Sequence, residues 1–153
     1  MATRKSETDN TTAAIARSLR LDDQAPSTTR PILYKELSYA VTGAAIAVHR
    51  HLGPGQLEST YERALAKELE YLGIPHRCQV PITASYRGDP VGEFYADVIV
   101  DQKIILELKS VERVAAVHRQ QVLSYLRATG LRLGMIMNFN STILFRAITR
   151  VVR

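Results

Sequence analysis

Two apolar segments joined by a tight turn constrain the fold of this 153-residue chain more than any other feature. Residues 92–100 and 103–109 are rich in valine, isoleucine and leucine, and the turn between them falls near Asp101 and Gln102. Short apolar runs bounded by turn residues are typical of buried strands. The sequence therefore predicts a β-hairpin whose two strands lie in the protein core.

Three charged side chains interrupt these strands. Asp97 is the only charged residue in segment 94–100, and Glu107 and Lys109 are the only charged residues in segment 104–109. Burying an ionised carboxylate without a partner costs on the order of several kcal/mol. A buried ion pair between Lys109 and one of the acids explains the charges about as well as a functional site does. The charges require one explanation or the other.

The register of the hairpin decides which side chains meet. If Val100 lies opposite Ile104, then Asp97 lies opposite Glu107, and directly paired residues share a face of the sheet. This register requires the three-residue connection 101–103. A two-residue turn would instead put Asp97 on the face opposite Glu107. The functional interpretation therefore makes a geometric prediction.

A site with two adjacent carboxylates favours a bound cation. The two charges repel each other, so one group would be protonated unless a cation lies between them. Oxygen ligands of this kind suit Mg²⁺ or Mn²⁺, and such an ion polarises a phosphoryl oxygen and lowers the pKa of bound water. Lys109 could orient or deprotonate an attacking water and neutralise developing charge. Asp97, Glu107 and Lys109 are therefore candidate catalytic residues.

The rest of the pattern predicts an α/β chain of the α+β kind. Three hairpin-connected strands followed by a helical crossover imply a mixed sheet with helices packed on it. In the first strand, alternation predicts one shared side for Cys78, Val80, Ile82 and Ala84. The expected helices cover about 36–51, 57–72 and 113–128, and the expected strands outside the central hairpin cover 77–86, 131–138 and 142–151.

Composition limits the class of protein. The single Cys78 cannot form an internal disulfide, the N-terminus has no apolar signal sequence, and no apolar run is long enough to span a membrane. We therefore expect a cytoplasmic protein with no membrane contact. Residues 1–30 are rich in Thr, Ser, Ala and charge, which predicts a flexible leader with a short helical turn in Thr12–Leu21. The folded domain is expected over residues 34–153.

The charge distribution favours a polyanionic partner. The net charge is +5, and no acidic residue follows Glu112, although seven arginines do. Such a basic stretch is typical of nucleic-acid binding. A solvated basic surface without a partner explains the same charges about as well.

These residues carry a family resemblance. Asp97, followed after nine residues by Glu107-x-Lys109 in an apolar strand, resembles the signature of the PD-(D/E)XK nuclease superfamily. The stretch Gly55–Tyr61 is similar to the GxxExxY motif that names one family within it, and the similarity spans roughly residues 34–150. The resemblance implies a restriction-endonuclease-like core of αβββαβ topology. It also implies a nuclease that hydrolyses phosphodiester bonds in DNA or RNA with Mg²⁺ or Mn²⁺.

The resemblance also implies roles for further residues. Glu58 and the Leu108 carbonyl would join Asp97 and Glu107 around the metal ion. Residues Gln121–Tyr125 match a QxxxY motif, whose glutamine and tyrosine would help to hold the substrate. A carboxylate favoured by the helix dipole is the other explanation of Glu58.

One helical face carries the candidate substrate contacts. His118, Gln121 and Tyr125 fall at helical spacing, which puts them on one side of the expected helix. His118 is a candidate phosphate contact, and a polar stripe with Tyr125 in the core is the other explanation. After the fourth strand the sequence has Asn138-Phe139-Asn140 where the family usually has Asn-Phe-Gly. Because asparagine tolerates a left-handed turn, we expect the following hairpin to be kept.

Two alternatives remain open at the level of the sequence. The domain could be a non-catalytic module that keeps the nuclease fold and binds nucleic acid or protein. It could also serve a larger assembly, since the Ala-rich stretch 40–47 permits close helix packing and could serve a homodimer.

Overall fold

The computed structural model describes residues 30–153 of the chain. The leader expected over residues 1–30, with its helical turn at Thr12–Leu21, therefore lies almost wholly outside the described residues. Among the described helices, none has both the length and the apolar character needed to cross a membrane.

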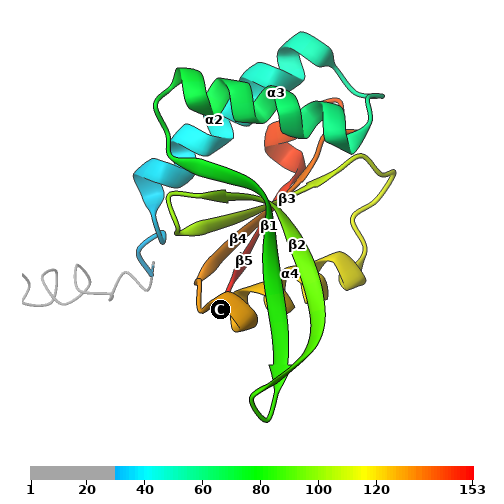
Figure 1. Ribbon diagram of the computed structural model, residues 1–153. Helices are drawn as coiled ribbons and strands as arrows, with labels where there is room; N and C mark the ends of the chain where they lie inside the picture. Colours follow the sequence, from blue (N-terminus) through cyan, green and yellow to red (C-terminus); the bar gives the residue numbers. More distant parts are fainter. Residues whose placement is uncertain (1–29) are drawn as a thin grey trace, which may run out of the picture. The chain divides into compact units, whose positions relative to one another are not determined.

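A five-stranded mixed sheet forms the centre of the domain, as the sequence predicted (Figure 1). The strands lie side by side in chain order, the first three antiparallel, β4 parallel to β3, and β5 antiparallel to β4. The helix α4 makes the crossover between the two parallel strands. The strands are β1 (His76–Tyr86), β2 (Asp89–Val100), β3 (Ile104–Lys109), β4 (Leu133–Asn138) and β5 (Ile148–Val152).

Helices cover both faces of this sheet. Figure 1 shows α2 (Lys35–Leu52) and α3 (Glu58–Tyr71) on one face and α4 (Ala116–Thr129) on the other. Ala44 and Ala45 of the Ala-rich stretch are buried inside the chain, where α2 packs on the sheet. On the other face, a Cβ atom at Gly134 would lie 2.3 Å from Val122 of α4, so glycine permits the close approach of that helix. The first two helices match their predicted ranges to within a residue.

The third helix starts later than the expected residue 113. The Asn138 side chain bonds both backbone groups of Val111, at 3.1 Å to N and 2.8 Å to O, and this holds the chain after β3 near the end of β4. The ring Nδ1 of His118 accepts the Ala115 amide at 3.0 Å and so satisfies a backbone donor at the helix start. These two contacts move the start of the helix to Ala116.

The predicted strand 142–151 is wrong in its first half. A short 3-10 helix, η2 (Leu144–Ala147), precedes β5. The Ser141 hydroxyl accepts the Ile143 amide at 3.2 Å, which forms a local turn, and Leu144 is buried in the cluster beneath α2 and α3. Asn140 is not among the non-glycine residues of positive φ in residues 30–153, so this turn does not need a left-handed residue there.

The register of the central hairpin agrees with the prediction. Val100 pairs with Ile104, and the connection consists of three residues, of which Asp101 and Gln102 have φ values of 47° and 53°. Direct pairing ends at Val98 and Leu106. Asp97 and Glu107 would be the next pair in this register, but strand pairing does not extend to them.

The β1–β2 hairpin reverses its faces at Asp97, which the alternating pattern did not predict. Val98 packs in the cluster beneath α2 and α3, whereas Ala96 packs in the cluster on the α4 side. Cys78 pairs with Val98, and Val80 pairs with Ala96. The expected grouping of Cys78 with Val80 on one side of β1 is therefore wrong.

Candidate metal centre

Asp97 lies at the place where β2 separates from β3. Because strand pairing ends at Leu106, the Leu108 amide has no partner in β2, and Asp97 Oδ2 accepts its hydrogen bond at 2.8 Å. The N–H and C=O of one strand residue point to the same neighbour, so the Leu108 carbonyl also points toward this gap. Burial raises the pKa of Asp97 above its ordinary value, although the Leu108 amide and the Lys109 charge act to lower it.

Glu107 is the most deeply buried charged side chain of the site. The whole residue is 4% exposed, its Oε1 lies 3.1 Å from Lys109 Nζ, and its Oε2 has no hydrogen-bond partner among residues 30–153. Burial, and after it the Asp97 charge, raise the pKa of Glu107 from 4.5 to about 7. A buried oxygen without a donor is unfavourable unless something else neutralises it. The ion pair with Lys109 therefore accounts for only one of the two oxygens.

Lys109 remains a cation in this environment. Burial acts to lower its pKa, but the Glu107 carboxylate and the other nearby acids outweigh burial and raise the pKa above the ordinary value. At neutral pH, Lys109 can donate hydrogen bonds and stabilise negative charge, but it has no lone pair with which to remove a proton.

Glu58 is the first residue of α3 and reaches the end of β3. Its Oε1 accepts the Ser110 amide at 3.1 Å, and the Ser110 hydroxyl donates to the Gln56 carbonyl at 3.0 Å. Glu58 is close enough to raise the pKa values of both Asp97 and Glu107. Its place in the first helical turn also fits the dipole explanation.

Tyr61 holds the loop that carries Glu58. The tyrosine is fully buried and stacks on Phe139, with ring centroids 4.4 Å apart. Its hydroxyl donates to the Gly53 carbonyl at 2.6 Å and accepts the Gln56 amide at 3.1 Å. Gly55 has a φ of 100°, a backbone conformation that residues other than glycine rarely adopt. In the spacing Gly-x-x-Glu-x-x-Tyr, the glycine thus permits the turn, the glutamate bonds the end of β3, and the tyrosine holds the loop between them.

The α4 face brings Tyr125 and Gln121 to the same region. Tyr125 is buried, its ring lies 5.7 Å from that of Phe94, and its hydroxyl accepts Gln121 Nε2 at 2.8 Å. Burial and then the Glu107 charge raise the pKa of Tyr125. His118 lies at the start of α4, where its ring has the capping contact described above.

Sequence reasoning missed Glu62 and Gln79. Gln79 Nε2 donates to Glu62 Oε2 at 2.7 Å. The Gln79 side chain acts to lower the pKa of Asp97, and the Asp97 charge acts to raise the pKa of Glu62. Glu62 follows Glu58 by one helical turn, which was a usable signal, because residues four apart share a helix face. Gln79 gave no signal, since it looks like an ordinary outward polar residue of an alternating strand.

The side chains alone do not form a complete ligand cage. Within residues 30–153, no three imidazole, thiol or carboxylate groups are arranged to hold a metal ion by themselves. A divalent ion would therefore need the Leu108 carbonyl and water in addition to Asp97 and Glu107. The unpartnered Glu107 oxygen and the all-oxygen donor set fit Mg²⁺ or Mn²⁺.

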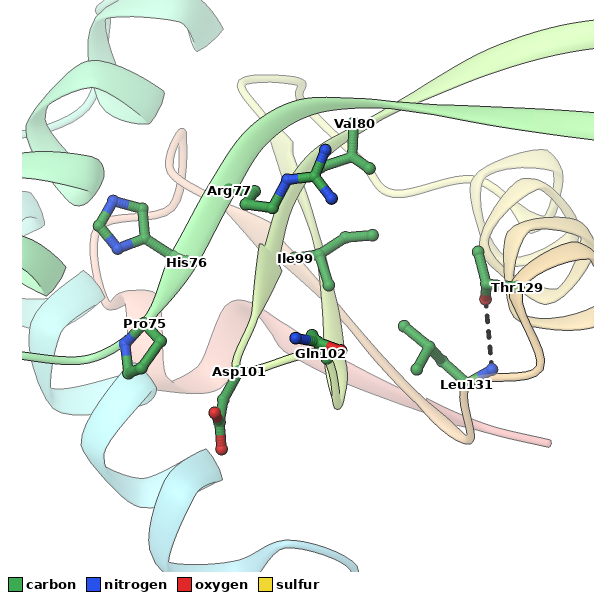
Figure 2. A pocket seen from close by; sticks show the side chains of 9 residues that line it. All are labelled: Pro75, His76, Arg77, Val80, Ile99, Asp101, Gln102, Thr129 and Leu131. Atoms are coloured by element: carbon green, nitrogen blue, oxygen red, sulfur yellow. Dashed lines mark hydrogen bonds between the residues drawn. The ribbon is translucent and has the colours of Figure 1, made fainter.

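A cavity of about 340 Å³ lies elsewhere on the domain (Figure 2). It is formed by the start of β1, the β2–β3 turn and the segment after α4, with Arg77, Ile99 and Leu131 among its lining residues. The Thr129 hydroxyl accepts the Leu131 amide at its edge, at 3.3 Å. None of the candidate site residues lines this cavity, so it is not part of the site.

The fold and the site together define an α+β domain with two acids and a lysine at the end of its central hairpin. The chain belongs to the PD-(D/E)XK nuclease superfamily, whose family model matches residues 35–151. The mixed sheet and the three α-helices described within residues 30–153 are consistent with the restriction-endonuclease-like fold implied by the sequence. No curated protein and no solved structure matches the chain.

Proposed function

We propose that residues 34–153 form a metal-dependent nuclease domain that hydrolyses phosphodiester bonds in DNA or RNA. The observation that carries this proposal is the buried Oε2 of Glu107, which lies beside a second carboxylate and has no hydrogen-bond partner within the described part of the chain. A divalent cation would neutralise both acids, which an ion pair with one lysine cannot do. Membership of a nuclease superfamily supports nucleic acid as the substrate.

Asp97, Glu107 and the Leu108 carbonyl would hold the cation, and Glu58 would complete the set. When bound, a cation of this kind lowers the pKa of water and polarises a phosphoryl oxygen. Glu58 would have to exchange its bond with the Ser110 amide for the ion, or reach the ion through water. The two hydrogen bonds of the Tyr61 hydroxyl hold the loop that precedes Glu58.

Lys109 would orient the attacking water and stabilise the charge that develops on phosphate. The Glu107 carboxylate holds its ammonium group at 3.1 Å. Because Lys109 is protonated at neutral pH, the orienting role is favoured over the removal of a proton.

The α4 residues would contact the nucleic acid. The Gln121 amide uses one N–H on Tyr125 and has a second N–H for the substrate. In His118, Nδ1 accepts the Ala115 amide, so the ring proton lies on Nε2, which can donate to a phosphate. The seven arginines after Glu112 support a polyanionic partner.

Within the superfamily we assign the chain to the GxxExxY family. The support is the stretch Gly55–Tyr61, in which each of the three motif residues has a physical task in the same loop.

The test is a cleavage assay with matched variants. Purified protein is incubated with labelled single- and double-stranded DNA and RNA in Mg²⁺ or Mn²⁺, with a chelator as control. We expect Asp97→Asn and Lys109→Ala to reduce the rate by about 10²–10⁴-fold. Asp101→Asn and Lys103→Ala make the same chemical changes at the other end of the hairpin and should leave the rate unchanged. Intact substrates, together with Mn²⁺ affinity that is unchanged in Asp97→Ala, would refute the proposal.

A non-catalytic binding module is the second candidate. It is favoured by the incomplete ligand cage within the described residues and by the engagement of Glu58 with Ser110. This function predicts oligonucleotide binding that does not depend on metal, no cleavage under any condition, and no effect of Asp97→Asn on affinity.

A further inference from the structure

Gln79 lies opposite Asp97 at the point where the β1–β2 hairpin reverses its faces. The neighbouring pairs are Cys78 with Val98 and Val80 with Ala96. Gln79 has a φ of 49°, a left-handed conformation that is unfavourable for a residue with a side chain. A strained residue inside a strand persists only where its surroundings hold it. The reversal coincides with the point where pairing between β2 and β3 ends.

The Gln79 side chain lies between two acids. Its Nε2 donates to Glu62 Oε2 at 2.7 Å, and the same amide is close enough to Asp97 to lower the pKa of that carboxyl. A primary amide has two N–H donors, and the Glu62 bond uses one of them. Glu62 and Asp97 repel each other, and the Asp97 charge contributes to the raised pKa of Glu62. An amide donor between them offsets this repulsion without adding a charge.

We propose that Gln79 is a positioning residue for Asp97. Its left-handed backbone turns the hairpin over, and its amide, held by Glu62, keeps the Asp97 carboxylate directed at the Leu108 amide. Glu62 thereby acts through Gln79 and does not touch the metal ion. The consequence for metal binding rests on the proposed function, in which Asp97 is a ligand.

The main experiment compares Gln79→Gly with Gln102→Gly. Both wild-type residues have left-handed backbones, and glycine adopts that conformation without strain, so both variants should fold. Only Gln79→Gly removes an amide from the site. We expect it to weaken Mn²⁺ binding by about tenfold, the effect typical of losing a group that supports a ligand, while Gln102→Gly binds as the wild type does.

A second readout needs no metal. Hydrogen exchange of the Leu108 amide, measured by NMR, reports its bond to Asp97 directly, and the Leu106 amide in the same strand serves as internal reference. We expect Leu108 protection to fall about fivefold relative to Leu106 in Gln79→Gly and to be unchanged in Gln102→Gly. Equal protection in the two variants would overturn the inference.

The two readouts separate this inference from the proposed function. If no form of the protein binds Mn²⁺ or cleaves nucleic acid, the proposed function fails, while Leu108 protection still decides the role of Gln79. If Leu108 loses protection but Mn²⁺ affinity does not change, Asp97 is not a ligand, and the proposed metal centre is overturned instead.

Glu62 variants test how Gln79 is held. Glu62→Gln keeps an oxygen that can accept the Gln79 amide, so Leu108 protection should stay near that of the wild type. Glu62→Ala removes the acceptor and should give part of the loss seen in Gln79→Gly. If Glu62→Ala leaves protection unchanged, Glu62 has no part in positioning Asp97.

Discussion

The central hairpin carries two acid-x-lysine pairs, one at each end. Asp101 and Lys103 lie in the β2–β3 turn with side chains 37% and 47% exposed, whereas Glu107 and Lys109 at the end of β3 are 5% and 15% exposed. Both pairs form ion pairs. In the turn, water solvates the atoms that the ion pair leaves free, but one oxygen of the buried Glu107 has no hydrogen-bond donor among the described residues. Equal charges at equal spacing thus give a solvated turn in one place and a candidate metal centre in the other.

The largest expected difference between the two ends concerns the lysines. At about pH 8 without divalent ions, Lys109→Ala leaves a buried carboxylate unpaired and should lower the free energy of unfolding by about 3 kcal/mol. Lys103→Ala should cause no measurable change, because exposed pairs contribute little. Urea unfolding measures both variants. Equal effects would mean that burial does not distinguish the two ends.

The second difference concerns pH. The folded-state pKa of Glu107 is raised from 4.5 to about 7, so the folded protein binds more protons than the unfolded chain between these values. The free energy of unfolding should therefore increase as the pH falls, by about 2 kcal/mol from pH 8 to pH 5.5 without divalent ions. Thermal unfolding across this range tests the sign, since a Glu107 with an ordinary pKa would give no such increase.

The control for this pH effect again uses the other end of the hairpin. Glu107→Gln cannot titrate and should remove most of the dependence between pH 5.5 and pH 8, whereas Asp101→Asn should keep it. If the free energy of unfolding of Glu107→Gln still depends on pH in this range, the dependence is assigned to Asp97, whose pKa is also raised.

The smallest effect concerns the loop that supports the buried end. Tyr61→Phe keeps the ring against Phe139 but loses the two hydrogen bonds of the hydroxyl, which should lower the free energy of unfolding by about 1 kcal/mol. Tyr71→Phe, on the same helix and 84% exposed, is the matched control and should change nothing. Denaturant unfolding of both variants measures the difference. Equal stability of the two would show that the loop does not depend on Tyr61.

The sequence predicted the central hairpin well because the apolar side chains of β2 and β3 are compatible with few other arrangements. Buried strands with apolar residues on both faces define their own ends, and the three-residue connection at 101–103 determines the register from Val100 onward. The three charges were visible as exceptions in apolar strands. The placement of Glu58 beside them came from the motif, since pattern alone does not bring residues 49 positions apart together.

Other features depend on contacts that no local pattern carries. The start of α4 is determined by Asn138, which is distant in the sequence, and by a histidine used as a cap. The break before β5 depends on burying Leu144 under a helix from the other end of the domain. The left-handed backbone of Gln79 is a conformation that glutamine rarely adopts, so local sequence does not predict it. Such exceptions are expected at functional sites.

The face reversal at Asp97 has an evolutionary consequence. It divides the β1–β2 hairpin into an inner part, whose register is fixed by β3, and an outer part, which extends beyond the other strands (Figure 1). The outer part already contains a second irregularity, between Ala84 and Ser85. Insertions and deletions beyond Ile82 and Phe94, which still pack on the α4 side, leave Asp97 in place, because pairing with β3 lies entirely on the inner side. Related chains are therefore expected to differ in the length of the outer end of this hairpin, while Asp97 keeps its place relative to β3.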